Sequence, residues 1–197
     1  MSNHQSSQTP SQTVGPFFHP GLVVGGEQIL VRDGARGQRI VVTGRVLDGD
    51  GATVPDALVE IWQADSAGIF SHPEDPRHAQ ADPNFKNFGR SDTRHPGDTY
   101  RFETVKPGVV AGLNGAMQAP HLAVRIFSRG LLTHLSTRIY FSDEDAANKT
   151  DATLARLPAT RRGTLIAVRD NTVTGSVVHY RHDFVLQGRG ETVFFQP

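Results

Sequence analysis

HLAVRIFS, residues 121–128, is the stretch from which the fold of this sequence is most readily inferred. Leu122, Val124 and Ile126 fall on one face of an extended chain, because successive side chains of a β-strand point to opposite faces. The other face begins with His121 and has Ala123 two residues later. The alternation predicts a half-buried strand. It also raises the question whether the strand holds a metal site, the remains of one, or a structural histidine.

Further segments along the 197 residues also have the pattern of short strands. The 20 glycines and 12 prolines provide the turns between them. Asp48–Gly51, DGDG, is a strong signal for a hairpin turn. We therefore predict one mainly β domain, a two-layer β-sandwich. The other predicted strands lie within residues 38–47, 57–65, 99–108, 136–141, 164–170 and 177–188.

Three features are expected outside these strands. A single peripheral helix is predicted from Ser142, as the cap, to about Leu157, where Pro158 ends it. Residues 66–97 are predicted to form one long loop, and loops of this length are usually functional. Residues 1–12, rich in Ser, Gln and Thr, are predicted to be an N-terminal arm that only a partner would order, ahead of a domain over residues 13–197.

The composition excludes several classes of function. The 20 basic and 20 acidic residues balance, so no overall charge attracts nucleic acid or an anionic membrane. The chain has no cysteine, which excludes disulfides and thiolate chemistry. We find no apolar run long enough to span a bilayer and no pattern of a secretory signal, and we expect a cytoplasmic protein.

The residues alone leave the metal question open. Two histidines spaced i and i+2 on a strand could chelate one ion, but His121 has only Ala123 at that spacing. His134, Tyr140 and Tyr180 are conceivable further ligands, although each is also explained as an ordinary residue of a β protein. The sequence contains no Gly-x-Ser-x-Gly elbow and no glycine-rich phosphate loop.

Six segments, in order along nearly the whole chain, resemble the α subunits of the intradiol ring-cleavage dioxygenases that act on protocatechuate. The resemblance implies a β-sandwich that pairs with an iron-bearing β subunit in a hetero-oligomer of αβ pairs. It also implies Fe(III) held by two tyrosines and two histidines of the β subunit, and cleavage of protocatechuate with O2 to 3-carboxy-cis,cis-muconate. The segments are SQTVGPFF (11–18), VEIWQADSAGIF (59–70), DPNFKNFGR (82–90), TVKPGVV (104–110), APHLAVRIFSRGLLTHLSTRIYF (119–141) and GETVFF (190–195).

The same resemblance implies that this chain lacks the ligand set. His121 matches the first histidine of the family's His-x-His, and Ala123 stands at the second. The second tyrosine falls after Pro107-Gly108, where this chain has Val109 and Val110. The loop that carries the first tyrosine matches residues 72–81, which contain none. Val110, His121 and Ala123 are therefore expected to be vestigial positions, and His121 a structural residue.

The resemblance also implies a role in closing the partner's pocket. Thr13, Gly15 and Pro16 match an N-terminal segment that lines the iron pocket of the β subunit, and Arg129 matches an arginine of that pocket. A guanidinium would bind either the substrate carboxylate or charge that develops during ring opening. Without the resemblance, residues 13–16 are explained as a turn and Arg129 as a salt-bridged strand end.

The other large aromatic side chains are interpreted as structural. Phe17, Phe18 and Trp62 are expected to be core or subunit-interface anchors rather than platforms for substrate. Two rival functions remain open. One is a non-catalytic scaffold or binding protein derived from the same family, and the other is a self-sufficient enzyme with a rebuilt metal site at His121, His134, Tyr140 or Tyr180.

Overall fold

The computed structural model describes residues 8–112, 115–173 and 175–196. The helices and strands follow one another along the chain as α1 (Phe18–Leu22), β1 (Arg39–Leu47), β2 (Leu58–Trp62), η1 (His78–Gln80), β3 (Phe88–Asp92), β4 (Thr99–Val105), β5 (Val110–Ala111), β6 (Met117–Gln118), β7 (His121–Phe127), β8 (Leu135–Phe141), α2 (Asp145–Thr150), α3 (Ala152–Arg156), α4 (Ala159–Arg162), η3 (Gly163–Leu165), β9 (Ile166–Asp170), β10 (Val178–Arg181) and β11 (Phe184–Val185).

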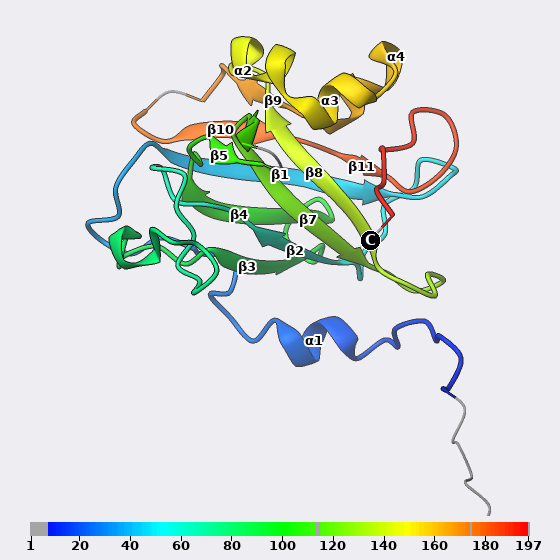
Figure 1. The fold of residues 1–197 in the computed structure, drawn as a ribbon. Coiled ribbons are helices and arrows are strands. Elements are labelled where there is room, and N and C mark those ends of the chain that lie inside the picture. The colour runs from blue at the N-terminus through cyan, green and yellow to red at the C-terminus, as the bar shows by residue number, and fades with distance from the viewer. Residues whose placement is uncertain (1–7, 113–114, 174, 197) are drawn as a thin grey trace, which may run out of the picture.

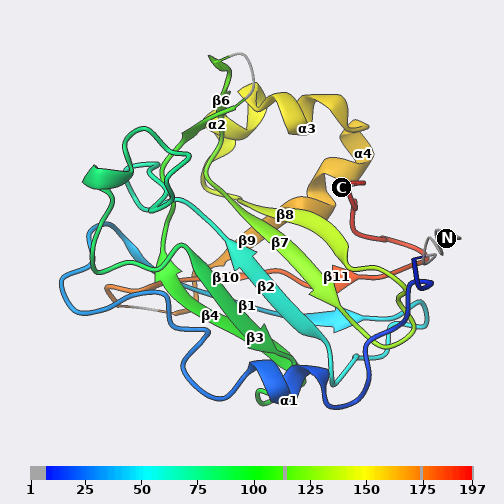
Figure 2. The same cartoon turned by 60° about the horizontal axis from the view of Figure 1, so that its bottom comes forward.

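Nine of the strands in the described part of the chain form two layers that are joined into one sheet, and β5 and β6 form a separate two-stranded sheet (Figure 1). One layer contains β4, β1 and β10, with β11 continuing along β1, and the other contains β3, β2, β7 and β8 in this order. Strand β9 joins them, because it pairs in parallel with β8 and antiparallel with β10. Helices α2, α3 and α4 lie at one side of the sandwich, and α1 lies at the opposite side (Figures 1 and 2). This arrangement confirms the predicted β-sandwich.

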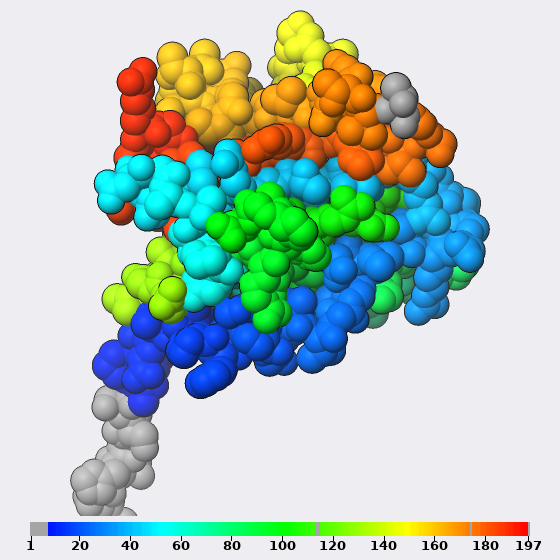
Figure 3. Space-filling model, turned by 180° about the vertical axis from the view of Figure 1, so that it is seen from behind, coloured from blue at the N-terminus to red at the C-terminus, as the bar shows by residue number. Residues whose placement is uncertain are grey.

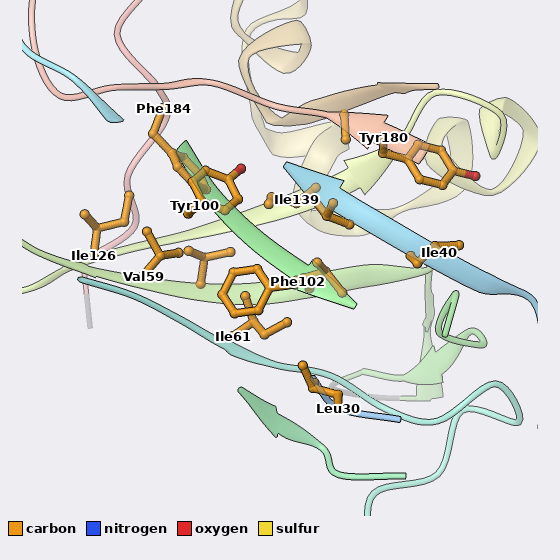
Figure 4. Close-up of a cluster of buried hydrophobic side chains, with 14 of the residues drawn as sticks. Leu30, Ile40, Val59, Ile61, Tyr100, Phe102, Ile126, Ile139, Tyr180 and Phe184 are labelled. Atoms are coloured by element: carbon orange, nitrogen blue, oxygen red, sulfur yellow. The ribbon is translucent and has the colours of Figure 1, made fainter. Parts of the chain in front are cut away.

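The core lies between the two layers, where side chains from both pack face to face (Figure 4). Tyr100 and Phe102 of β4 are fully buried against Val59 and Ile61 of β2 and their neighbours. The Tyr100 hydroxyl donates a hydrogen bond of 2.6 Å to the carbonyl oxygen of His182. Gly44 leaves room for this hydrogen bond, because a Cβ at position 44 would lie 1.6 Å from the same carbonyl oxygen.

Strand β7 has the predicted alternation. Leu122, Val124 and Ile126 are buried in the core, and the residues between them face outward from the sandwich. The alternation of apolar residues therefore predicted correctly which face of this strand lies in the core. Its neighbours are β2 on one side and β8 on the other, both antiparallel.

The prediction of one peripheral helix over residues 142–157 is wrong. The segment forms α2 and α3, and two further short helices, α1 and α4, occur elsewhere among the described residues. Asp151 causes the break: its backbone is extended, and its carboxylate accepts hydrogen bonds from the backbone N–H groups of Thr153 and Leu154 at the start of α3. Ser142 does not cap a helix, because its hydroxyl accepts a hydrogen bond from the backbone N–H of Arg169.

One further expectation is confirmed and another needs correction. The DGDG turn closes a short hairpin, because Asp48 N donates to Ala52 O and Leu47 pairs antiparallel with Thr53, and the chain then crosses to β2 in the other layer. Residues 66–97 are not a single loop, since they contain η1 and the edge strand β3, which pairs with β2 from Leu58↔Asp92 to Trp62↔Phe88. The polar, glycine-containing sequence of β3 concealed it, as is common for strands at a sheet edge.

The predicted N-terminal arm covers residues 1–12. Of these, residues 1–7 lie outside the described residues. Residues 8–12 form neither helix nor strand. In the described part of the chain, every helix is too short or too polar to cross a membrane.

Candidate functional site

The predicted site residues gather at the two ends of β7. His121 is the first residue of this strand, and Arg129 follows two residues after its last. Along the strand, Ala123 pairs with Trp62 of β2 on one side and with Arg138 of β8 on the other. The antiparallel register thus places each end of β7 beside a particular residue of β2.

His121 is engaged by its own segment. Its Nδ1 lies 2.8 Å from the carbonyl oxygen of Ala119, and because a carbonyl only accepts, Nδ1 carries the proton and donates. The ring lies 5.6 Å from the ring of Tyr140, its cross-strand partner. Burial, with the nearby charge of Arg138, lowers the pKa of His121 to about 4. The imidazole is therefore neutral at physiological pH and is held as a structural group.

Asp151 anchors the surroundings of His121. Its carboxylate is fully buried and accepts hydrogen bonds from the backbone N–H of Ala119 at 2.9 Å and from the Tyr140 hydroxyl at 3.2 Å, besides capping α3. Burial raises the pKa of Tyr140 to about 12, so this phenol keeps its proton. Asp151 thus ties β7, β8 and α3 together, a role that the sequence analysis did not identify.

Two of the three positions expected to be vestigial, Val110 and Ala123, line cavities beside Trp62. Val110 lines a cavity of about 640 Å³ together with Trp62, and so do residues of the 72–77 segment, where the family's first tyrosine was expected. Ala123 lines a neighbouring cavity of about 480 Å³, which also includes Trp62. Trp62 stacks on Phe70 at 5.7 Å and is 37% exposed, so of the two expected roles it is not a core anchor, and its role as a subunit-interface anchor stays a prediction. Val110 and Ala123 thus lie on cavities that share Trp62, whereas neither cavity includes His121.

The donors at these positions do not fit a ferric ion. The side chains of Val110 and Ala123 have no coordinating atoms. His121 donates from Nδ1 to Ala119, so its Nε2 is the one donor atom that these three positions offer a metal. A ferric site of this kind needs several hard anionic or imidazole donors. Among residues 8–112, 115–173 and 175–196, no group of three or more His, Cys, Asp or Glu is placed to hold a metal ion.

The further ligands considered for a rebuilt site do not converge on His121. The ring of His134 lies 5.5 Å from that of Phe127, at the opposite end of β7. The Tyr180 hydroxyl is hydrogen-bonded to Asp143 at 2.8 Å, and burial raises the pKa of Tyr180 to about 12. Only Tyr140 is a neighbour of His121, and it is a protonated phenol bound to Asp151.

At the other end of β7, the residues predicted to close a partner's pocket come together. The backbone N–H of Gly130 donates to the Thr13 hydroxyl at 2.8 Å, although the two residues are 117 positions apart. The N-terminal residues, in blue, lie against the yellow-green turn around residue 130 (Figure 3). Gly15 and Pro16 are exposed in the same segment, and the Gly15 carbonyl accepts from the N–H of Phe18 at the start of α1.

Phe17 and Phe18, which follow this segment, have different roles. Phe18 packs against Phe127 at 5.4 Å between ring centroids, as an anchor of the N-terminal segment. Phe17 is 84% exposed and contributes nothing to the core of this chain. An exposed phenylalanine beside Gly15 and Pro16 is available to a partner surface.

Arg129 extends from the turn after β7, with a side chain that is 61% exposed. Its Nε lies 2.5 Å from Oδ2 of Asp56. The sequence analysis expected a salt bridge only as the alternative to a pocket role, and it did not identify Asp56 as the partner. The register of β2 and β7 contains the missing signal, because Leu58 pairs with Phe127 and the same ladder continued by two residues sets Asp56 opposite Arg129.

A solved structure with the same architecture identifies the class of fold. The dioxygenase domain of a dioxygenase–carbohydrate-binding protein fusion from Streptomyces sp. SirexAA-E matches with a TM-score of 0.60 and 23% identity, over 92% of this chain and 99% of that chain. The fold is therefore that of a β-sandwich dioxygenase domain.

Sequence comparison identifies the family. The family model described as "Dioxygenase" matches residues 14–188. The chain is 44% identical to the protocatechuate 3,4-dioxygenase alpha chain of Burkholderia cepacia, over 95% of this chain and 96% of that protein. It is 36% identical to the beta chain from the same organism, over 92% of this chain and 77% of that protein. The chain belongs to the intradiol dioxygenase family.

Proposed function

We propose that this chain is the α subunit, without iron of its own, of a protocatechuate 3,4-dioxygenase. The enzyme would cleave protocatechuate with O2 to 3-carboxy-cis,cis-muconate. The observation that carries the proposal is the similarity to an alpha chain over nearly the whole length, combined with Val110 and Ala123 at positions where a ferric site needs donors. The similarity to a beta chain supports a partner of related fold.

The iron belongs to the partner in this proposal. Fe(III) held by the β subunit would supply the site at which the two catechol oxygens bind. This chain would contribute the walls of that pocket through Thr13, Gly15, Pro16 and Arg129. The hydrogen bond from Gly130 to Thr13 supports this, because it keeps the N-terminal segment beside the turn that carries Arg129.

The role of Arg129 follows from its chemistry. A guanidinium presents fixed positive charge and five N–H donors in a plane, and it remains protonated at any pH at which the enzyme works. In the partner's pocket it would bind the substrate carboxylate or the charge that develops as the ring opens. Its exposure of 61% leaves it accessible to a partner that covers this end of the sandwich.

Two parts of the proposal rest on the sequence. The arm at residues 1–12 would be ordered by the β subunit, and the domain would extend over residues 13–197 in a hetero-oligomer of αβ pairs. A cytoplasmic location agrees with the absence of cysteine from the whole chain.

Co-expression with a β chain from the same organism tests the proposal. We expect a stable complex with one iron per αβ pair and protocatechuate-dependent O2 uptake. The chain expressed alone should contain no stoichiometric iron and should have no activity. A coloured, oxygen-consuming chain purified alone would contradict the proposal in favour of the self-sufficient enzyme. A β chain whose activity is the same with and without this chain would favour the scaffold.

A further inference from the structure

The contact between Asp56 and Arg129 follows from the sheet itself. Strand β2 begins at Leu58, which pairs with Phe127 at the end of β7. Asp56 lies in the turn just before β2, and Arg129 in the turn just after β7. These two turns are therefore adjacent because of the antiparallel register, and opposite charges at such cross-strand positions attract each other.

Asp56 is the fixed member of this pair. The next residue, Ala57, is fully buried, and its backbone N–H donates to the Thr93 hydroxyl at 3.1 Å. The Asp56 side chain is 15% exposed, whereas that of Arg129 is 61% exposed. A largely buried acid on a rigid backbone thus holds a long and otherwise flexible cation.

The carboxylate of Asp56 is not otherwise satisfied. Among the described residues, its Oδ1 is buried and has no hydrogen-bond partner. An unpaired buried carboxylate oxygen costs free energy, so stability of this chain alone does not explain an acid at this position.

The geometry of the pair leaves Arg129 free to bind an anion. The contact is an ion pair at Nε of Arg129, not a hydrogen bond from one of the five N–H donors of the guanidinium. Its two terminal nitrogens can still form two parallel hydrogen bonds to a second carboxylate. Both residues line a cavity of about 480 Å³ at this end of the sandwich.

We propose that Asp56 is a positioning residue that holds Arg129 by Nε and so limits the guanidinium to orientations in which its terminal N–H groups face the partner's pocket. This inference rests on the proposed function, in which Arg129 binds the carboxylate of protocatechuate. Asp56 would not touch the substrate itself. The Arg129 side chain would then lose less conformational entropy when the substrate binds.

The αβ complex with Asp56→Asn tests this inference, with Asp56→Glu as the conservative variant and Asp50→Asn as a matched control in the same connection. For Asp56→Asn we expect KM for protocatechuate to rise about 3-fold to 5-fold, the effect of one loosened exposed ion pair, with kcat little changed. Kinetics with catechol, which has no carboxylate, should stay at wild-type values. Asp56→Glu should recover part of the loss, and Asp50→Asn should match the wild type.

Four outcomes would overturn the inference. If Arg129→Ala impairs protocatechuate turnover but Asp56→Asn does not, Arg129 acts without Asp56, and the proposed function stands. Equal losses for protocatechuate and catechol, or a lowered melting temperature of the complex that accounts for the change, indicate a merely structural role. If Arg129→Ala has no effect, the pocket role of Arg129 fails. If no active complex forms with the β chain, the proposed function fails.

Discussion

The imidazole of His121, the first residue of β7, is enclosed by its own segment and by Tyr140. The guanidinium of Arg129, two residues after the last residue of β7, is largely exposed instead. His121 belongs to the outward-facing row of β7, and Arg129 lies in the turn that follows the same strand. At the His121 end, hydrogen bonds are satisfied within the chain. At the Arg129 end, donors remain available and Asp56 has an unpaired oxygen. One end thus serves the fold, and the other has the free donors that the proposed contact with a partner requires.

The largest effect is expected where the His121 end is anchored. Asp151→Ala removes the acceptor of four hydrogen bonds, three of them buried, from Ala119, Tyr140 and the start of α3, and should lower the free energy of unfolding by about 3–5 kcal/mol. Thermal unfolding of the αβ complex measures this. Asp145→Ala, which removes only an exposed pair with Lys149, is the control. A melting temperature equal to that of the control would refute the anchoring role.

The next largest effect is expected at the opposite end. Arg129→Ala should reduce kcat/KM of the αβ complex for protocatechuate by roughly 10-fold to 100-fold, the range for one hydrogen bond to a charged group. Iron content and melting temperature should not change, because Arg129 is exposed and remote from the core. Steady-state O2 uptake measures the loss. Unchanged turnover would show that this end of β7 does not serve the partner's pocket.

A smaller effect should appear in acid. The folded pKa of His121, about 4, lies below the ordinary value of 6.5, so the unfolded chain binds the proton more readily. Stability from this group is complete above pH 6.5 and is lost as the pH falls toward 4, by about 1–2 kcal/mol at pH 5. His121→Ala should therefore narrow the difference in melting temperature between pH 7 and pH 5, whereas the exposed His78→Ala should not. An unchanged pH dependence in His121→Ala would contradict the buried neutral imidazole.

No effect is expected on iron. His121→Ala and Ala123→His should both leave one iron per αβ pair, because neither one imidazole nor two make a ferric ligand set beside Val110. Metal analysis of the purified complexes measures this. Less iron in His121→Ala, or additional iron in Ala123→His, would show that the His121 end still binds metal.

The sequence predicted local features of the fold well and distant ones poorly. The alternation of β7 is a property of eight consecutive residues, and it correctly placed Leu122, Val124 and Ile126 in the core. The break between α2 and α3 at Asp151 was not predicted. It depends on hydrogen bonds from Ala119 and Tyr140 to the Asp151 carboxylate, and these form only in the folded chain. The parallel pairing of β8 with β9 also has no local signature.

The site was predictable only through resemblance. Thr13 and Arg129 were named because their surroundings match a family, and the contact of Thr13 with Gly130, the residue after Arg129, appears only in the folded chain. Asp56 carries no motif. Its role depends on the register between β2 and β7, and a sequence gives that register only after both strands and their pairing are known.

The position of β1 has a consequence for biosynthesis. One edge of this strand is covered early by β4, but the other waits for β10 and β11, which begin at Val178. During translation, the nascent polypeptide therefore exposes an unpaired edge of β1 until Val178 and the residues after it have been synthesised. Such an edge favours aggregation while it is bare. The yield of this protein in a cell should then depend on slow elongation and chaperone capacity more than on the stability of the finished sandwich.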